Sequence, residues 1–213
     1  MKMTMRYPGG LKKAVTFSYD DGVKADERLI GIMVKYGIRG TFNLNGCKYV
    51  DEDRKMLELA QKIYLPNGME IACHGFRHPF YEDLNEEDSE KDILADKETM
   101  KTSFGIDVRG FAYPYNSFND TTIALLKKHG FVYSRTCFAT ADFGLPEEPL
   151  FLKPTCHHAD EGVEEMIDKF FAEKTDEPRM FYLWGHSYEF DDNDNWDYIE
   201  NICKKIGGRD GIW

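Results

Sequence analysis

Two adjacent carboxylates follow directly on a short apolar segment near the start of the chain. Residues 14–19 read Ala-Val-Thr-Phe-Ser-Tyr, and Asp20, Asp21 and Gly22 come next. The segment is typical of a mostly buried strand, at whose end two carboxylates repel each other and resist desolvation unless a cation or a proton compensates them. A metal ion would provide that compensation. A helix cap or a turn is the alternative interpretation, because Asp and Gly are common in both.

Histidines follow two further apolar segments. Residues 69–73 lead into His74 and His78, which are four residues apart, and residues 180–185 lead into His186. Neutral imidazole is a common zinc ligand in proteins. Each histidine, taken alone, is also compatible with a surface loop. Their recurrence at the ends of separate apolar segments favours one shared site.

Short apolar segments alternate with helical patterns along the chain, which is typical of βα units. Six or seven units predict an α/β fold, a distorted or incomplete (β/α) barrel that forms a single domain over residues 1–213. With 213 residues and 42% apolar content, the chain can bury one sizeable core. Active sites in such barrels lie at the C-terminal ends of the strands, where Asp20, Asp21, His74 and His186 fall. We expect strands at 13–17, 40–43, 70–73, 110–112, 133–135 and 180–184, and helices at 26–36, 51–63, 86–102, 121–129, 162–172 and 196–205.

Four segments resemble, in order along the chain, the motifs of polysaccharide deacetylases that share the NodB homology domain, also called carbohydrate esterase family 4. They are residues 16–22, the His-x-x-x-His of 74–78, the segment around Pro114-Tyr115, and the Leu-x-x-His of 183–186. The resemblance covers most of the chain. It implies a metal-dependent deacetylase that acts on an N-acetylated or O-acetylated oligo- or polysaccharide.

The resemblance also implies a role for each motif residue. Asp20 would be the catalytic base and His186 the acid, while Asp21, His74 and His78 would bind a divalent metal, Zn²⁺ in the first place and Co²⁺ or Ni²⁺ as alternatives. The backbone N–H of Tyr115, which follows Pro114, would face the oxyanion. Asp20 and Asp21 can share these tasks only if the strand bends into a loop, because neighbouring strand residues otherwise point to opposite faces.

Two positions depart from the family pattern. The family commonly carries an Arg two residues before the motif's Pro, which orients the catalytic Asp, and this chain has Ala112 there. Arg135, after another apolar run, is a candidate to bring a guanidinium to Asp20 from a different strand, with a structural ion pair as the alternative. The Asp that pairs with the acid histidine in the family is not clearly present, and Asp142 is the nearest acidic candidate.

Further residues close to the motifs could contact a substrate. Trp184 and Tyr115 carry aromatic rings that can stack on sugar rings. His157 and His158 follow an apolar stretch and could contact the substrate or support the site, with a purely structural role as the alternative. Cys73 precedes His74 and is expected to pack in the core, because strand alternation points it away from the site.

Two other functions stay open from the sequence. Relatives of the family open small cyclic amides with similar metal chemistry, so an amidohydrolase is one alternative. A catalytically impaired glycan-binding domain is the other, and the Ala112 departure is the reason to keep it. Intact acidic and histidine motif positions favour an enzyme.

Composition limits the partners and the compartment. The net charge is −11 and no basic patch is apparent, which excludes a nucleic-acid partner. No apolar segment is long enough to span a bilayer. Five cysteines at irregular spacing and the lack of a signal-peptide pattern predict a cytoplasmic protein, with export as the alternative if the chain is a fragment. Residues 211–213 have the pattern of a strand that has only begun, which suggests truncation. The oligomeric state stays open.

Overall fold

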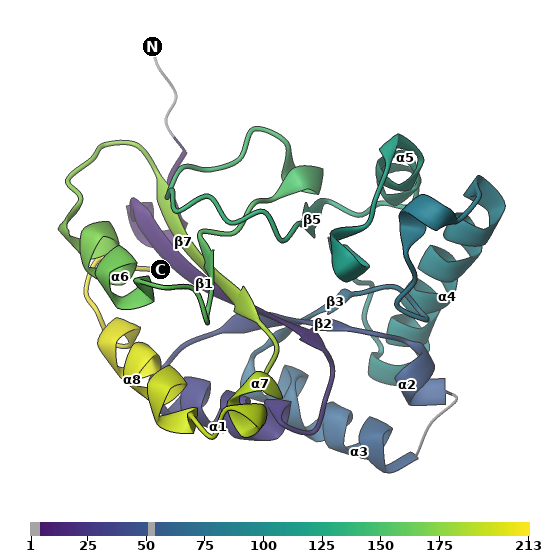
Figure 1. Ribbon diagram of the computed structural model, residues 1–213, viewed down its shortest axis with the longest axis horizontal. Coiled ribbons are helices and arrows are strands. Elements are labelled where there is room, and N and C mark those ends of the chain that lie inside the picture. Colours follow the sequence, from purple (N-terminus) through teal and green to yellow (C-terminus); the bar gives the residue numbers. More distant parts are fainter. Residues whose placement is uncertain (1–4, 51–53) are drawn as a thin grey trace.

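One parallel sheet of seven strands forms the centre of the computed structural model, which describes residues 5–50 and 54–213. The strand order is β5-β4-β3-β2-β1-β7-β6, and each neighbouring pair is parallel. The sheet curls into half a barrel, which confirms the expected incomplete (β/α) barrel in a single domain (Figure 1). The strands are β1 (Lys13–Asp21), β2 (Gly40–Leu44), β3 (Glu70–Cys73), β4 (Gly110–Ala112), β5 (Tyr133–Arg135), β6 (Cys156–His157) and β7 (Arg179–Gly185).

Helices α6, α8, α1, α3 and α4 follow one another around the outside of this sheet (Figure 1). Their apolar faces cover the strands, and the strands' C-terminal ends stay open for a site. The α-helices are α1 (Asp26–Lys35), α2 (Cys47–Val50), α3 (Arg54–Ile63), α4 (Glu86–Phe104), α5 (Asp120–Lys128), α6 (Val163–Ala172), α7 (Glu189–Asp192) and α8 (Trp196–Ile206). Short 3-10 turns are η1 (Pro8–Gly10), η2 (Leu65–Asn67), η3 (Tyr81–Asp83), η4 (Pro114–Asn116) and η5 (Pro149–Phe151).

The central strand β1 separates an apolar outer layer from a polar interior. Phe17 and Tyr19 are fully buried in the hydrophobic core. Ser18 and Asp20 alternate with them and meet Asn43 of β2, whose side-chain amide donates to Ser18 Oγ at 2.7 Å and to Asp20 Oδ1 at 2.8 Å. Because successive strand residues point to opposite faces, the same strand packs the helices and carries polar groups into the half-barrel.

A single segment connects the two edges of the sheet. Between β5 and β6 the structure has a long loop and η5 but no α-helix, within residues that are all described. Leu152 in this loop forms a parallel bridge with Arg135 of β5, and Cys156–His157 then pair with β7. The missing helix makes the barrel incomplete, and the loop brings β6 close to the C-terminal end of β7.

Most expected elements are present, with different ends. The strands expected at 70–73, 110–112 and 133–135 coincide with β3, β4 and β5, whereas β1 runs four residues further, to Asp21. Residues 51–53 of the expected helix 51–63 lie outside the described residues. Strand β6 and the four-residue helices α2 and α7 were not predicted, because they are too short to show a period.

Two smaller expectations can also be checked. Ile212 bridges Lys13, and the backbone groups of Trp213 bond to those of Lys13 and Val15, so the C-terminal residues do pair with β1. Cys73 is completely buried in the core, as expected. Within the described ranges, no helix combines the length and the apolar character that crossing a bilayer needs.

Candidate active site

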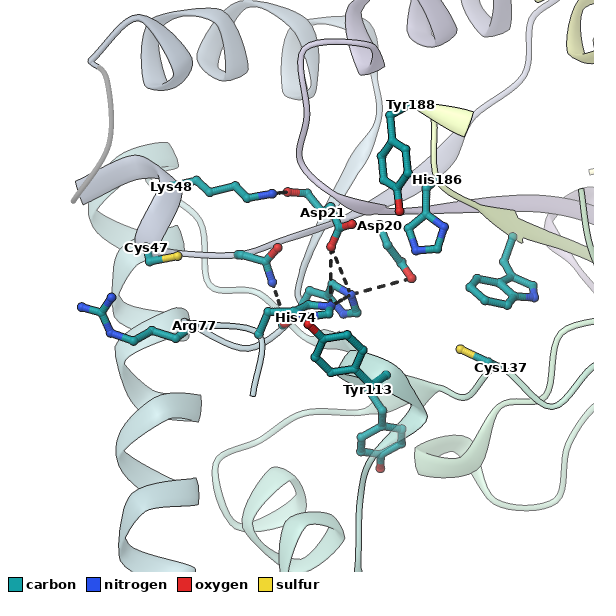
Figure 2. A pocket seen from close by; sticks show the side chains of 14 residues that line it. Asp20, Asp21, Cys47, Lys48, His74, Arg77, Tyr113, Cys137, His186 and Tyr188 are labelled. Atoms are coloured by element: carbon teal, nitrogen blue, oxygen red, sulfur yellow. Dashed lines mark hydrogen bonds and ion pairs between the residues drawn. The ribbon is translucent and has the colours of Figure 1, made fainter. Parts of the chain in front are cut away.

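A cavity of about 580 Å³ lies at the C-terminal ends of the strands. It brings together the five residues that the sequence predicts as metal ligands, base and acid: Asp20, Asp21, His74, His78 and His186. Asp20, Asp21 and His186 reach it from β1 and from the end of β7, and His74 follows β3 (Figure 2). The remaining lining residues are Asn45, Cys47, Lys48, Arg77, Tyr113, Tyr115, Cys137, Trp184 and Tyr188.

Three side chains converge on one point of this cavity. The Nε2 atoms of His74 and His78 are 3.1 Å apart, and Asp21 Oδ1 lies 3.7 Å from the first and 3.6 Å from the second. Two zinc–imidazole bonds of about 2.0–2.1 Å at a tetrahedral angle would place the nitrogens roughly 3.3 Å apart. The three atoms are therefore spaced as the ligands of one metal ion.

The protonation of the two histidines fits a cation as well. His74 Nδ1 lies 2.8 Å from the carbonyl oxygen of Ala112, so it carries the ring proton and leaves Nε2 with a lone pair. Burial lowers the pKa of His74, and burial together with the neighbouring His74 lowers the pKa of His78 to about 4. Both shifts favour the uncharged imidazole, and the lone pair on His74 Nε2 faces the point where the three side chains converge.

Left-handed backbone conformations occur at three residues of the site. Asp21, His78 and Tyr115 have φ values of 80°, 53° and 53°, which non-glycine residues seldom adopt. Such conformations cost of order 1–3 kcal/mol each and cluster at functional sites. At Asp21 the unusual φ is the bend that the sequence required, because it lets Asp20 and Asp21 both face the cavity although they are neighbours in β1.

Two carboxylates of α4 hold the loop that carries the histidines. Asp96 accepts hydrogen bonds from the backbone N–H of His74 at 3.0 Å and of Gly46 at 2.8 Å. Asp92, one turn earlier, accepts from the N–H of Phe76 at 2.9 Å and of Arg77 at 3.1 Å. Since buried N–H groups need partners, these bonds fix the loop between the rings of His74 and His78. The sequence analysis missed both residues, for which an Asp pair four apart on a helix was the only signal.

Asp20 faces the same cavity but is held by a different partner. Its carboxylate forms a buried ion pair with Arg135, whose Nε also donates to Ser18 Oγ at 3.2 Å. Burial alone would raise the pKa of Asp20, but the charges of Arg135, His74 and His186 outweigh it and lower the pKa to about 2. The carboxylate is therefore ionised at neutral pH. The predicted contact between Arg135 and Asp20 is confirmed.

Register explains how Arg135 reaches the place that Ala112 cannot fill. Ala112 of β4 and Arg135 of β5 are direct partners in the sheet. Paired residues of neighbouring parallel strands point to the same face, so Arg135 projects into the half-barrel beside the small Ala112 side chain. Arg135 therefore brings a guanidinium to Asp20 from β5, the strand next to the one that carries Ala112.

Replacing Arg135 by Met should lower both stability and turnover. Removing one partner of a buried ion pair leaves an uncompensated charge, so we expect the free energy of unfolding to fall by about 3–5 kcal/mol. Adding Ala112→Arg to this variant should restore part of both quantities, because the two positions are neighbours in register. Denaturant unfolding and steady-state kinetics measure the outcome.

Arg179→Met is the matched control for this experiment. Its guanidinium pairs with Glu173 at 2.9 Å, but both side chains are partly exposed, so the change should cost at most about 1 kcal/mol. Wild-type stability and turnover in Arg135→Met would show that the buried pair contributes to neither.

His186 lies across the cavity and pairs with Glu189. Its Nδ1 is 3.1 Å from Glu189 Oε1. Burial would lower the pKa of His186, but Glu189, Asp20 and Asp21 outweigh it and raise the pKa above its usual value. The expectation that Asp142 pairs with this histidine is wrong, because Asp142 lies in an exposed turn and accepts from the N–H of Gly144. Glu189 was missed, although its spacing of three residues from His186 was a possible signal.

The other predicted site residues differ in how closely they approach the cavity. Tyr115 and Trp184 line it, and Tyr115 is 59% exposed. Trp184 contacts the Arg135 guanidinium, which lies 4.5 Å from the ring centre. Pro114 is buried and is not among the lining residues. His157 does not line the cavity either, but its ring packs 4.6 Å from that of Trp184.

The chain is similar to known proteins in both sequence and fold. The sequence model of the family described as "Polysaccharide deacetylase" matches residues 8–134. A bifunctional xylanase/deacetylase from Pseudobutyrivibrio xylanivorans is 26% identical over 111 residues, which are 52% of this chain and 18% of that protein. The chain thus spans less than a fifth of the relative's length. The segment matched by the family model contains Asp20, Asp21, His74, His78 and Tyr115, and His186 lies beyond it.

Solved structures share the fold. A family 4 carbohydrate esterase from Streptomyces lividans, in complex with acetate, has a TM-score of 0.65 and 16% identity, with coverage of 95% of this chain and 91% of that one. The Puue allantoinase has a TM-score of 0.78 and 12% identity, with coverage of 97% and 88%. At these identities the likeness concerns the arrangement of strands and helices.

Proposed function

Because the chain belongs to the polysaccharide deacetylase family, we propose that it is a metal-dependent hydrolase that removes acetyl groups from a carbohydrate, in the first place from an N-acetylated sugar. The observation that carries this proposal is the composition of one cavity. A paired carboxylate, three converging metal-type ligands and a histidine paired with a carboxylate all face it (Figure 2). Hydrolysis of an amide or ester needs a base, an electrophile and an acid in one place.

The ligand set Asp21, His74 and His78 fits a divalent ion such as Zn²⁺, with Co²⁺ or Ni²⁺ as alternatives. Such an ion, when bound, lowers the pKa of water and polarises a carbonyl group. Three protein ligands leave coordination positions free, which is typical of catalytic sites.

The remaining steps fall to the chain's own residues. Asp20 accepts the proton of the attacking water, since Arg135 keeps its carboxylate ionised and oriented. The backbone N–H of Tyr115 donates to the oxyanion, the role that the family resemblance assigns to it. His186 gives its proton to the leaving nitrogen, and the negative charge of Glu189 stabilises the protonated ring.

An exposed aromatic pair beside the cavity supports a sugar as the substrate. Phe80 and Tyr115 stack with ring centres 4.0 Å apart and planes within 7°, although 51% and 59% of their surfaces remain exposed. Exposed apolar surface is costly and often marks a binding site. The flat, partly apolar face of a pyranose ring suits such a surface.

A ring-opening amidohydrolase is the second candidate, and the fold likeness to an allantoinase over almost the whole chain is the observation that favours it. The same base, acid and metal ligands would serve a cyclic amide. The third candidate, an impaired glycan-binding domain, loses its main support, because Arg135 supplies the guanidinium that Ala112 lacks.

Acetate release separates these candidates. The protein, first treated with a chelator and then given Zn²⁺, Co²⁺ or Ni²⁺, is incubated with N-acetylated and O-acetylated oligosaccharides and with a panel of cyclic amides. We expect acetate from at least one oligosaccharide only after metal addition. Turnover of cyclic amides alone would favour the amidohydrolase, and sugar binding with no turnover of any substrate would favour the binding domain.

A further inference from the structure

Glu189 lies among three imidazole rings, of which only one lines the cavity. Its Oε1 faces His186 Nδ1 at 3.1 Å. Its Oε2 faces His158 Nε2 at 2.7 Å and His157 Nε2 at 3.3 Å. One carboxylate oxygen thus serves the proposed proton donor, and the other faces two consecutive residues, His157 at the end of β6 and His158 directly after it.

The protons of these rings can be assigned from their partners. A carboxylate oxygen only accepts hydrogen bonds, so each ring nitrogen that faces Glu189 carries a proton. His157 is fixed in this form because its Nδ1 accepts the backbone N–H of Ala159 at 3.1 Å. Burial would raise the pKa of Glu189, but its bonds to His158 and His186 outweigh it and lower the pKa. Glu189 is therefore an anion that is hydrogen-bonded to His186 through Oε1 and faces the ring nitrogens of His158 and His157 through Oε2.

The same assignment argues against a second metal ion. His157, His158 and Glu189 bring ligand atoms within 4.8 Å of one another, as a metal site would. A metal ion needs a lone pair on the nitrogen that faces it, and the Nε2 of His157 has a proton there because Ala159 occupies the lone pair of Nδ1. The cluster is better explained as two imidazole rings, those of His157 and His158, that face one oxygen of the Glu189 carboxylate and that we call the clamp.

The clamp is rigid on one side. The buried His158 ring stacks on Tyr19 at 5.7 Å and packs at a tilt against Phe190 at 4.4 Å, and its backbone N–H donates to the carbonyl of Trp184 at 2.8 Å. A Cβ atom at residue 185 would overlap the His158 ring, so Gly185 makes this close approach possible. Glu189, in contrast, is a half-buried, rotatable side chain at the start of a four-residue helix. The contacts of its Oε2 are with the ring nitrogens of His158 and His157, so these two rings restrict its rotation.

We propose that His157 and His158 are positioning residues for proton transfer: they hold Oε2 of Glu189 so that Oε1 orients and charges His186. This inference rests on the proposed function, in which His186 protonates the leaving group. A small misplacement of a reacting group costs orders of magnitude in rate, so the effect should appear in turnover. It should be largest for substrates whose leaving group depends most on the acid.

Two substitutions at His158 separate the ring from its proton. His158→Phe keeps the stacking but removes the N–H, whereas His158→Gln places an amide N–H near the position of Nε2. We expect His158→Phe to lower kcat on an N-acetyl substrate by about 10–100-fold, as is usual when a group behind an active-site residue is removed, and His158→Gln to keep most of it. The KM and the metal content should not change. His157→Phe and His157→Gln form a second pair, in which we again expect the Phe variant to lose more kcat than the Gln variant.

The dependence on the leaving group identifies the mechanism. Across aryl acetates with phenols of increasing pKa, the Phe variants should lose little with the best leaving group and most with the poorest. Proton NMR provides a readout without substrate, because the Nδ1–H resonance of His186 should be lost or shifted in the Phe variants and kept in the Gln variants. His129→Phe is the control, because it removes another histidine–carboxylate pair, that of His129 with Glu90 at 2.6 Å, which lies outside the cavity. It should leave kcat and the His186 resonance unchanged.

Equal losses for all leaving groups, or an unchanged His186 resonance in His158→Phe, would overturn the inference. Failure of the proposed function looks different, because the wild-type protein would then release no acetate from any substrate. In that case the NMR comparison still decides whether the two histidines position His186.

Discussion

Replacing Asp20 by Asn will leave the metal ligands in place and remove most of the turnover. An amide cannot accept the proton of the attacking water, and a positioned base contributes about 10²–10⁴-fold to such reactions. The change is nearly isosteric, and the amide oxygen can still accept a hydrogen bond from Arg135, while the Asn43 amide, which donates to the other oxygen at 2.8 Å, has to turn and accept instead. Metal content by mass spectrometry and kcat on an acetylated sugar together test the assignment.

Asp142→Asn is the control for Asp20→Asn, because Asp142 lies in an exposed turn away from the cavity. It should keep full turnover. Loss of the metal in Asp20→Asn would make Asp20 a ligand, and full turnover in that variant would remove it from the reaction.

His74→Ala and His78→Ala will each lose bound metal and activity together. The two Nε2 atoms and Asp21 Oδ1 form a three-ligand set, and losing one ligand weakens both the geometry and the affinity. The loss in metal affinity should exceed the roughly 10–100-fold that follows when only a group behind a ligand is removed. Equilibrium dialysis against buffered Zn²⁺ and activity at saturating Zn²⁺ measure the two effects separately.

His129→Ala serves as the control for the two ligand variants, since His129 ends α5 and pairs with Glu90 outside the cavity. The ligand assignment would be wrong if His78→Ala kept one metal ion per protein and full activity. A loss of metal from His74→Ala alone would leave His78 as a neighbour of the site and not a ligand.

The residues that we propose as metal ligands could be brought together from the sequence because their positions depend on strand ends. Asp21 is the last residue of β1, and His74 directly follows β3. Because parallel strands end at the same edge of a sheet, an apolar run followed by a polar residue was enough to predict that the two side chains lie close together. Arg135 was found by the same rule at the end of β5. The (β/α) architecture followed from the alternation of apolar runs with helical periods.

The carboxylate partner of His186 could not be predicted in the same way. Glu189 meets His186 within one turn of chain, and its other oxygen meets β6, a two-residue strand without any sequence period. Asp142 was chosen because it was acidic and close in sequence to the expected motif, but it bonds to its own turn. The carboxylates Asp92 and Asp96 of α4 were also missed. Their partners are backbone N–H groups, which every residue except proline has, so no residue type in the sequence indicates them.

The side-by-side register of Ala112 and Arg135 bears on how such enzymes diverge. Two neighbouring positions can deliver a guanidinium to the same carboxylate, so an ancestor that carried arginine at both could lose either one without losing the ion pair. The chemical group would then persist in space while its motif disappears from the sequence. A search that judges activity from the residue two positions before the proline would discard such a protein as inactive, whereas one that inspects the adjacent strand would keep it.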